Sequence, residues 1–211
     1  MKYIIMCGGK YRNFETPKHL TVVKGESLVA RTIRLLREAG VDDIAISTNQ
    51  EGFDKFGVPV LKHNNTYRQE DDATYGDWVD GFYLMKEPVC YIFGDVVFSP
   101  EAIKTIVETE VEDIMFFASA PPFCEEYSKP WAEPFAFKVI NNNHFKRAIE
   151  LTKRCDEEGL FDRQPVSWEL WQVIKQTPLN EIDYTNYVVI NDYSCDIDYP
   201  EDVEAIERYI K

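Results

Sequence analysis

The sequence lacks any long apolar segment. No stretch approaches the roughly 20 apolar residues that a membrane-spanning helix requires, and the first apolar run, residues 3–6, is too short for a signal peptide. The cysteines are also few and scattered, without a C-x-x-C pair: they are Cys7, Cys90, Cys124, Cys155 and Cys195. An odd, dispersed set is typical of reduced thiols in a reducing compartment. We therefore expect a cytoplasmic protein that does not bind membranes.

Positive charge is scarce as well. The 211 residues include 23 Lys and Arg against 37 Asp and Glu, which gives a formal net charge of −14. Because a nucleic-acid-binding surface needs a stripe of basic residues, we expect no nucleic-acid partner. A small phosphorylated ligand remains compatible with this charge if a few bases converge on it or a metal ion supplies positive charge. The sequence allows a homo-oligomer but does not specify one.

Apolar patterning predicts strands that alternate with helices. Strands are expected at residues 2–6, 43–48, 58–61, 89–93, 113–118, 135–140 and 188–192, and helices at 27–40, 75–86, 143–158 and 167–176 and from Ser99 and Pro200 onward. Such alternation predicts an α/β fold with a mostly parallel sheet and helices on both faces. Without an internal repeat or a linker, we expect one domain, 1–211, with a small irregular insertion at about residues 119–180.

The loop CGGKYRNFETPKHL, residues 7–20, is basic in an otherwise acidic chain. In an open parallel sheet the first strand-to-helix loop is the usual phosphate site. Gly8 and Gly9 permit close approach of the backbone, and Arg12 and Lys18 could hold phosphate oxygens. The alternative is an ordinary turn with two solvated bases. The sequence contains neither G-x-x-x-x-G-K-[ST] nor G-x-G-x-x-G in this loop, which excludes a P-loop and a dinucleotide fingerprint.

Acidic residues follow two later strands. Asp95 ends the buried strand in YIFGDVVFS, residues 91–99, at the sheet edge where the basic loop begins. Asp196 and Asp198 in CDIDYPED lie two positions apart, so on an extended segment they share one face. Each position has a plainer interpretation. Asp95 could cap a helix or form a turn, and Asp198 could simply interact with the dipole of the helix that begins at Pro200.

The ordered set of these signals resembles the sugar-nucleotidyltransferase-like (NTP transferase) superfamily, closest in layout to the choline-phosphate-type cytidylyltransferases. The stretch YIIMCGGKYRNFETPKHLTVVKGESLVARTI carries the opening signature, with Lys10 and Tyr11 where the family usually has glycine. The resemblance implies a Rossmann-like, GT-A-like fold and a Mg²⁺ cofactor. The residues it implies for catalysis are Lys18 and Arg12, and those for the metal are Asp95, Asp198 and Asp196.

The reaction implied by the resemblance is nucleotidyl transfer. A phosphorylated small-molecule acceptor attacks the α-phosphate of a nucleoside triphosphate, most readily CTP, and pyrophosphate leaves. The residues expected to contact the nucleotide are Gly8, Gly9, Asn49, Thr74, Tyr75 and Gly76. Those expected to contact the acceptor are Lys138, for its phosphate, and Arg163, Glu133, Trp168 and Glu169.

Two other functions stay open on sequence alone. A GT-A-like glycosyltransferase also uses a D-x-D motif, but usually after a mid-chain strand, where this chain has the single Asp95. A non-catalytic nucleotide-binding module is the other alternative. The combination of Lys18 with Asp95 and Asp198 argues against it, because a protein that only binds nucleotide has no need to retain a metal site.

Overall fold

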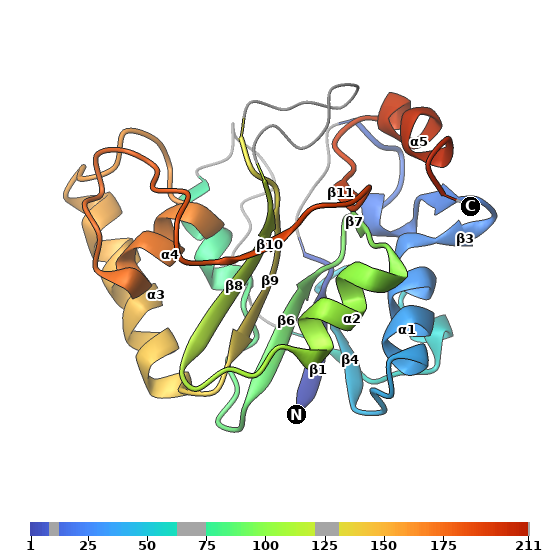
Figure 1. The fold of residues 1–211 in the computed structure, drawn as a ribbon, viewed down its shortest axis with the longest axis horizontal. Coiled ribbons are helices and arrows are strands. Elements are labelled where there is room, and N and C mark those ends of the chain that lie inside the picture. The colour runs from blue at the N-terminus through green and yellow to red at the C-terminus, as the bar shows by residue number, and fades with distance from the viewer. Residues whose placement is uncertain (9–12, 63–74, 121–130, 211) are drawn as a thin grey trace.

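A computed structural model describes residues 1–8, 13–62, 75–120 and 131–210 of the chain. Its centre is a seven-stranded sheet with the order β10-β8-β9-β6-β1-β4-β5 (Figure 1). The strands are β1 (Lys2–Met6), β4 (Ile44–Ser47), β5 (Val60–Leu61), β6 (Val89–Phe93), β8 (Ile114–Ser119), β9 (Pro134–Val139) and β10 (Val188–Ile190). Two short ladders, β2 (Val22–Val23) with β3 (Glu26–Ser27) and β7 (Val96–Val97) with β11 (Cys195–Asp196), lie outside this sheet.

The sheet is mostly parallel, as the alternation of strands and helices predicts. Only β9 runs antiparallel to its two neighbours in the sheet, β6 and β8. The strand pairs β1–β4, β1–β6, β4–β5 and β8–β10 are all parallel. In the β6–β9 register Ile92 lies opposite Ala136, so the residues before β9 share an edge of the sheet with the residues after β6. The start of β9 therefore belongs to the end of the sheet where ligands are expected.

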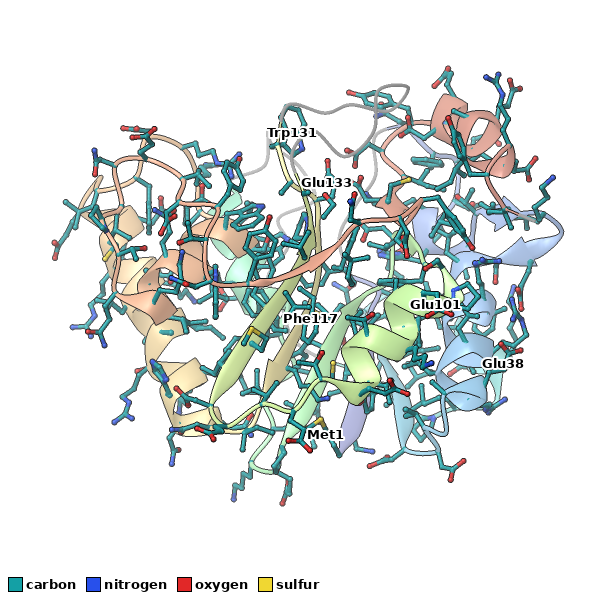
Figure 2. All side chains as sticks on the ribbon, viewed as in Figure 1. Met1, Glu38, Glu101, Phe117, Trp131 and Glu133 are labelled. Atoms are coloured by element: carbon teal, nitrogen blue, oxygen red, sulfur yellow. The ribbon has the colours of Figure 1, made fainter. Side chains whose placement is uncertain are left out.

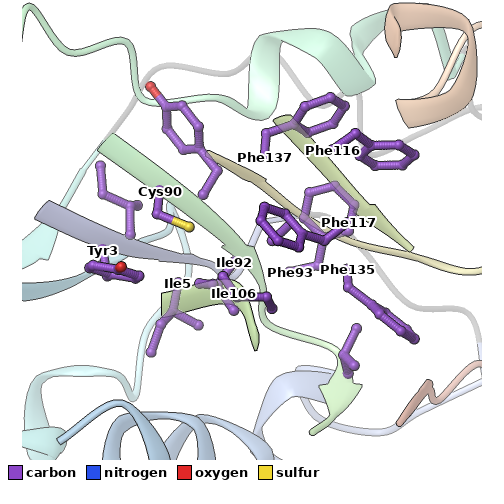
Figure 3. Packing of buried hydrophobic residues seen from close by; sticks show 14 of the residues in the cluster. Tyr3, Ile5, Cys90, Ile92, Phe93, Ile106, Phe116, Phe117, Phe135 and Phe137 are labelled. Atoms are coloured by element: carbon purple, nitrogen blue, oxygen red, sulfur yellow. The ribbon is translucent and has the colours of Figure 1, made fainter. Parts of the chain in front are cut away.

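Helices cover both faces of this sheet. The α-helices are α1 (Leu28–Glu38), α2 (Pro100–Glu108), α3 (Asn142–Glu157), α4 (Ser167–Lys175) and α5 (Pro200–Glu207), and the 3-10 helices are η1 (Lys18–Leu20), η2 (Asp54–Phe56) and η3 (Tyr75–Gly81). Helices α1 and α2 pack together on one face, and α3, α4 and η3 lie on the other (Figures 1 and 3). In the described part of the chain, no helix combines the length and the apolar character that crossing a membrane requires.

Buried hydrophobic side chains cover both faces of the sheet. Towards α3 and α4 the core is aromatic: the rings of Phe116 and Phe137 stack with centroids 4.5 Å apart, and Trp168 meets Phe116 edge-on at 4.8 Å (Figure 3). Towards α1 and α2 the core combines aliphatic side chains such as Ile92 and Ile106 (Figure 3) with the ring of Phe98, which meets Phe135 edge-on at 5.9 Å. All five residues of β6 are buried, which confirms the prediction that its continuous apolar run is covered on both sides.

Local sequence signals place several helix starts correctly. Ser27 accepts a hydrogen bond from Ala30 N at the start of α1, and Ser99 accepts one from Ala102 N at the start of α2. The helix expected at residues 75–86 is wrong, because only the 3-10 turn η3 forms there and it ends at Gly81. Phe82 instead packs among aromatic side chains, with its ring centroid 5.0 Å from the ring centroids of both Tyr91 and Phe145. This packing overrides the local preference for helix.

Candidate active site

Lys18, the first residue of η1, is the centre of the candidate site. Its side chain is 7% exposed, and its Nζ lies 2.8 Å from Asp95 Oδ2 and 3.1 Å from Asp198 Oδ1. These three residues come from the first loop, the end of β6 and the segment before α5. The fold thus brings together a base and two acids that the sequence singled out, at the end of the sheet where β7 and β11 also lie (Figure 1).

Gly94 allows Asp95 to reach this position. Its N–H donates to Met6 O at 3.0 Å, which holds the end of β6 against the end of β1. A Cβ at this position would lie 2.5 Å from Met6 O and 2.7 Å from Cys7 Sγ, closer than such atoms approach one another. Only glycine fits here, and the residue that follows it is directed to Lys18.

Asp198 is positioned by a separate ladder. Strands β7 and β11 pair antiparallel, with Asp196 opposite Val96, and Ile197 N donates to Asp95 O at 3.0 Å. The segment that carries Asp198 is therefore bonded to the segment that carries Asp95. The acid that caps the N-terminal end of α5 is Asp202, whose Oδ2 accepts hydrogen bonds from Asp198 N and Tyr199 N, each at 2.9 Å.

The charges in this cluster stabilise one another. Burial by itself disfavours the ammonium of Lys18, but Asp95, Asp198 and Asp196 outweigh it and raise the pKa of Lys18 above its usual value. Burial likewise disfavours the Asp95 carboxylate, yet the charge of Lys18 lowers the pKa of Asp95 below its ordinary range. Near neutral pH the cluster therefore holds the Lys18 ammonium beside the ionised Asp95 carboxylate. Asp196 is close enough to contribute to it.

His19 is a member of the cluster that sequence reasoning missed. The side chain is 2% exposed and meets Phe53 edge-on at 6.2 Å between ring centroids. Burial lowers the pKa of His19 to about 3, so the imidazole is neutral near neutral pH. Its position directly after Lys18, in the signature P-K-H-L, was the available signal.

The predicted nucleotide contacts lie partly in this region. Gly8 and Asn49 follow the ends of β1 and β4, which pair in parallel with Met6 opposite Ser47. Thr48 Oγ1 donates to Cys7 O at 2.6 Å and ties these two strand ends together. Tyr75 and Gly76 begin η3. The remaining expected ligands, Gly9, Arg12 and Thr74, lie outside the described residues.

Asp95 and Asp198 form a donor set that suits a divalent ion. Their carboxylates converge on one cation, the Lys18 ammonium, so they are close enough to share a ligand. Within the described ranges no group of three or more His, Cys, Asp or Glu residues forms a metal cluster. Mg²⁺ often takes only one or two carboxylates and completes its shell with phosphate oxygens and waters. Two aspartates therefore fit Mg²⁺ that arrives with a nucleotide.

Residues 3–120 match the family model of the MobA-like NTP transferase domain. The chain belongs to this nucleotidyltransferase family. The match includes Lys18 and Asp95 but ends before Asp198. A comparison with curated proteins gives no significant match.

Solved structures of nucleotidyltransferases share the fold over the full length. The CTP:phosphocholine cytidylyltransferase LicC of Streptococcus pneumoniae is 17% identical, with a TM-score of 0.56 and coverage of 100% of this chain and 99% of LicC. HddC of Yersinia pseudotuberculosis, solved with GMP-PN, is 14% identical with a TM-score of 0.57, over 100% and 99% of the two chains. The inositol-1-phosphate CTP transferase of T. maritima is 17% identical with a TM-score of 0.53, over 99% and 95%.

Glu133 is the predicted acceptor residue of this NTP transferase that lies nearest the sheet edge of Asp95. It directly precedes β9, and its N–H donates to Ser119 Oγ at 2.8 Å. Its carboxylate accepts the indole N–H of Trp131 at 2.7 Å. Figure 2 shows Trp131 and Glu133 at the end of the sheet opposite Met1. Glu133 therefore lies at the same end of the sheet as Asp95.

Trp168 and Glu169, which belong to α4, and Arg163, which lies in the segment before α4, support this region. Trp168 Nε1 donates to Ala132 O at 2.8 Å, which holds the strand entry beside Glu133. Glu169 is 2% exposed, caps α4 by accepting from Val166 N at 2.9 Å, and pairs with Arg163. Trp168 and Glu169 thus already have structural contacts, so a contact with the acceptor would be additional to these.

Lys138 does not lie at the site. Its Nζ donates to Ile106 O, Val107 O and Thr109 O at 3.1, 2.9 and 2.7 Å and so caps the C-terminal end of α2. In the antiparallel β6–β9 register Lys138 lies opposite Cys90, near the beginning of β6 and so at the end of the strand away from Asp95. This placement corrects the expectation that Lys138 binds the acceptor phosphate.

Proposed function

We propose that this NTP transferase moves CMP from CTP to a phosphorylated small-molecule acceptor and releases pyrophosphate. The observation that carries the proposal is the convergence of Lys18, Asp95 and Asp198 at one end of a parallel sheet. A base and two acids in contact suit a ligand that is itself a polyanion with a bound cation. A nucleoside triphosphate complexed with Mg²⁺ is such a ligand.

In the proposed reaction an oxygen of the acceptor phosphate attacks the α-phosphorus of the triphosphate. The bond from this phosphorus to the bridging oxygen breaks, and pyrophosphate carries the electron pair away. Lys18 stabilises the negative charge that develops on the leaving group. Asp95 and Asp198 would hold the Mg²⁺ ion, which neutralises phosphate charge when bound. Asp196 contributes further negative charge beside them.

No covalent intermediate on the protein is needed. Cys7 lies close enough to the cluster to sense the charge of Asp95, but it is fully buried, and burial, together with that charge, raises the pKa of its thiol. The thiol therefore stays protonated and unreactive. Positioning of the two substrates and neutralisation of charge account for the chemistry.

The choice of CTP rests on the relatives. Two of the three structural relatives described above are named for CTP, with phosphocholine and inositol-1-phosphate as the acceptors in their names. From these two relatives we extend to this protein the use of CTP and the requirement for a phosphorylated acceptor. Phosphorylated amino alcohols, sugar 1-phosphates and polyol phosphates are the acceptor classes to test.

Pyrophosphate release tests this proposal. The protein is mixed with Mg²⁺ and each of CTP, UTP, GTP and ATP, with and without each acceptor class. We expect release that depends on an acceptor and is fastest with CTP. A glycosyltransferase or a non-catalytic nucleotide-binding protein would release none, and acceptor-independent release would indicate hydrolysis instead.

A matched pair of lysine variants ties the activity to the site. Lys18→Ala should lower turnover by roughly two or more orders of magnitude, the scale for losing a charge contact made in the transition state. Lys146→Ala, on the exposed surface of α3, should retain the parent rate. Equal rates for the two variants, with the fold intact, would remove Lys18 from the mechanism.

A further inference from the structure

Lys18 occupies the position between the two carboxylates that would bind the metal. Its ammonium is almost fully buried and contacts an oxygen of Asp95 and an oxygen of Asp198, whose side chains are 26% and 42% exposed. Each acid thus already has a cationic partner in the nucleotide-free protein. The buried position and the two short contacts distinguish this group from a solvated surface ion pair.

A divalent ion on the same carboxylates would lie beside the ammonium. Two cations repel each other, and the repulsion is strong where solvent is largely excluded. Lys18 can relieve it only by moving to other oxygens, since a buried ammonium without a partner is costly. A triphosphate supplies such oxygens, and the four-carbon stem of lysine gives the ammonium the reach to exchange partners.

We propose that Lys18 competes with the divalent ion for Asp95 and Asp198, so that the metal binds tightly only together with the nucleoside triphosphate. This rests on the proposed function, because the triphosphate is the ligand that draws Lys18 away. Metal and nucleotide then bind with positive coupling through one side chain. The nucleotide-free protein keeps both acids paired with Lys18 and has little affinity for the free ion.

The test measures Mn²⁺ binding to the nucleotide-free, full-length protein by titration calorimetry and by the electron paramagnetic resonance of free Mn²⁺. Lys18→Met keeps most of the length of the side chain and removes its charge. It should bind Mn²⁺ roughly tenfold or more tightly than the parent, within the usual range for coupling between two ligands. Lys18→Arg keeps the charge and should bind Mn²⁺ as weakly as the parent. Adding Asp95→Asn to Lys18→Met should abolish the gain.

Loss of Lys18 could destabilise the fold, so a second measurement follows thermal unfolding with and without Mn²⁺ and compares the rise in melting temperature that the ion causes in each protein. Lys18→Gln, a second uncharged variant, should gain more in melting temperature from Mn²⁺ than the parent gains, because only the variant binds the free ion tightly. Equal Mn²⁺ affinity in the parent and both uncharged variants would overturn the proposal, as would tight Mn²⁺ binding by the parent alone. Failure of the parent to release pyrophosphate with any substrate would instead refute the proposed function. The comparison of Mn²⁺ affinities could still be interpreted, because it uses nucleotide-free protein and does not depend on turnover.

Discussion

Gly94→Ala should destabilise the protein because the new methyl group has no room. Its Cβ would lie 2.5 Å from Met6 O, 2.7 Å from Cys7 Sγ and 3.1 Å from His19 Cδ2. The carbonyl of Met6 cannot move aside easily, since it accepts the N–H of residue 94 and belongs to β1, which is paired on both sides with β4 and β6. The strand ends must separate instead.

The size of the effect follows from this contact. Forcing an extra methyl group into a packed core costs about 1–3 kcal/mol, and contact with a hydrogen-bonded backbone oxygen places this substitution near the upper limit. For a chain of this size each kcal/mol lowers the melting temperature by about 2–4 °C, so we expect a fall of roughly 6–12 °C. Because Asp95 follows directly, pyrophosphate release should also fall in molecules that remain folded.

Gly81→Ala is the matched control. Among the described residues, its Cβ would meet Met6 Cε at 3.7 Å, which is an ordinary van der Waals contact. Its stability should stay within about 0.5 kcal/mol of the parent. Both variants are measured by thermal unfolding followed by circular dichroism and by turnover well below the transition. If Gly94→Ala unfolds at the same temperature as Gly81→Ala, the ends of β1 and β6 separate at little cost and the steric argument fails.

Three further predictions concern the charged residues. Asp95→Asn and Asp198→Asn should each remove most Mg²⁺-dependent turnover, and the double variant should be little slower than either single variant. If the losses in turnover instead multiply in the double variant, the two acids do not share an ion. Burial lowers the pKa of His19 from 6.5 to about 3, so its contribution to stability is complete above about pH 6.5 and is lost as the pH falls, by up to about 1.4 kcal/mol per pH unit. Urea unfolding at pH 7, 6 and 5 should therefore show a shallower pH dependence for His19→Asn than for the parent. Lys138→Met should lower the free energy of unfolding by about 1–3 kcal/mol, because it removes the hydrogen bonds to the end of α2, and it should leave the KM for the acceptor unchanged. A raised KM would show that Lys138 contributes to acceptor binding.

Features that depend on neighbouring residues were predictable from the sequence. Ser27 and Ser99 each cap the first turn of the helix that follows them, so the sequence next to each serine is enough to predict the cap. The continuous apolar run of β6 is likewise enough to predict that this strand is buried. The convergence of Lys18 with Asp95 was also predictable. Parallel strands end at the same edge of a sheet, so a loop after one strand and an acid after its neighbour must meet.

Features that depend on strand direction and tertiary packing were not predictable. The run PFAFKV marks a buried strand, but nothing in it specifies that β9 runs antiparallel. That reversal places Glu133 at the sheet edge of the candidate site and Lys138 at the opposite edge. Similarly, the pattern at residues 75–86 suits a helix, and only the aromatic cluster around Phe82 explains why the helix stops.

The position of Asp198 depends on a contact that the sequence does not reveal, and this contact determines which part of the site can move. Strands β7 and β11 pair Val97 with Cys195 and Val96 with Asp196. Beyond this ladder, the N–H of Ile197, the residue before Asp198, donates to the main-chain O of Asp95. The separation of Asp95 and Asp198 is thus held by the main chain. Lys18, by contrast, comes from η1 and reaches both acids only through its side chain. In the proposed binding of metal and nucleotide, the Lys18 ammonium can therefore change partners while the main-chain segments that carry the two acids stay bonded to each other.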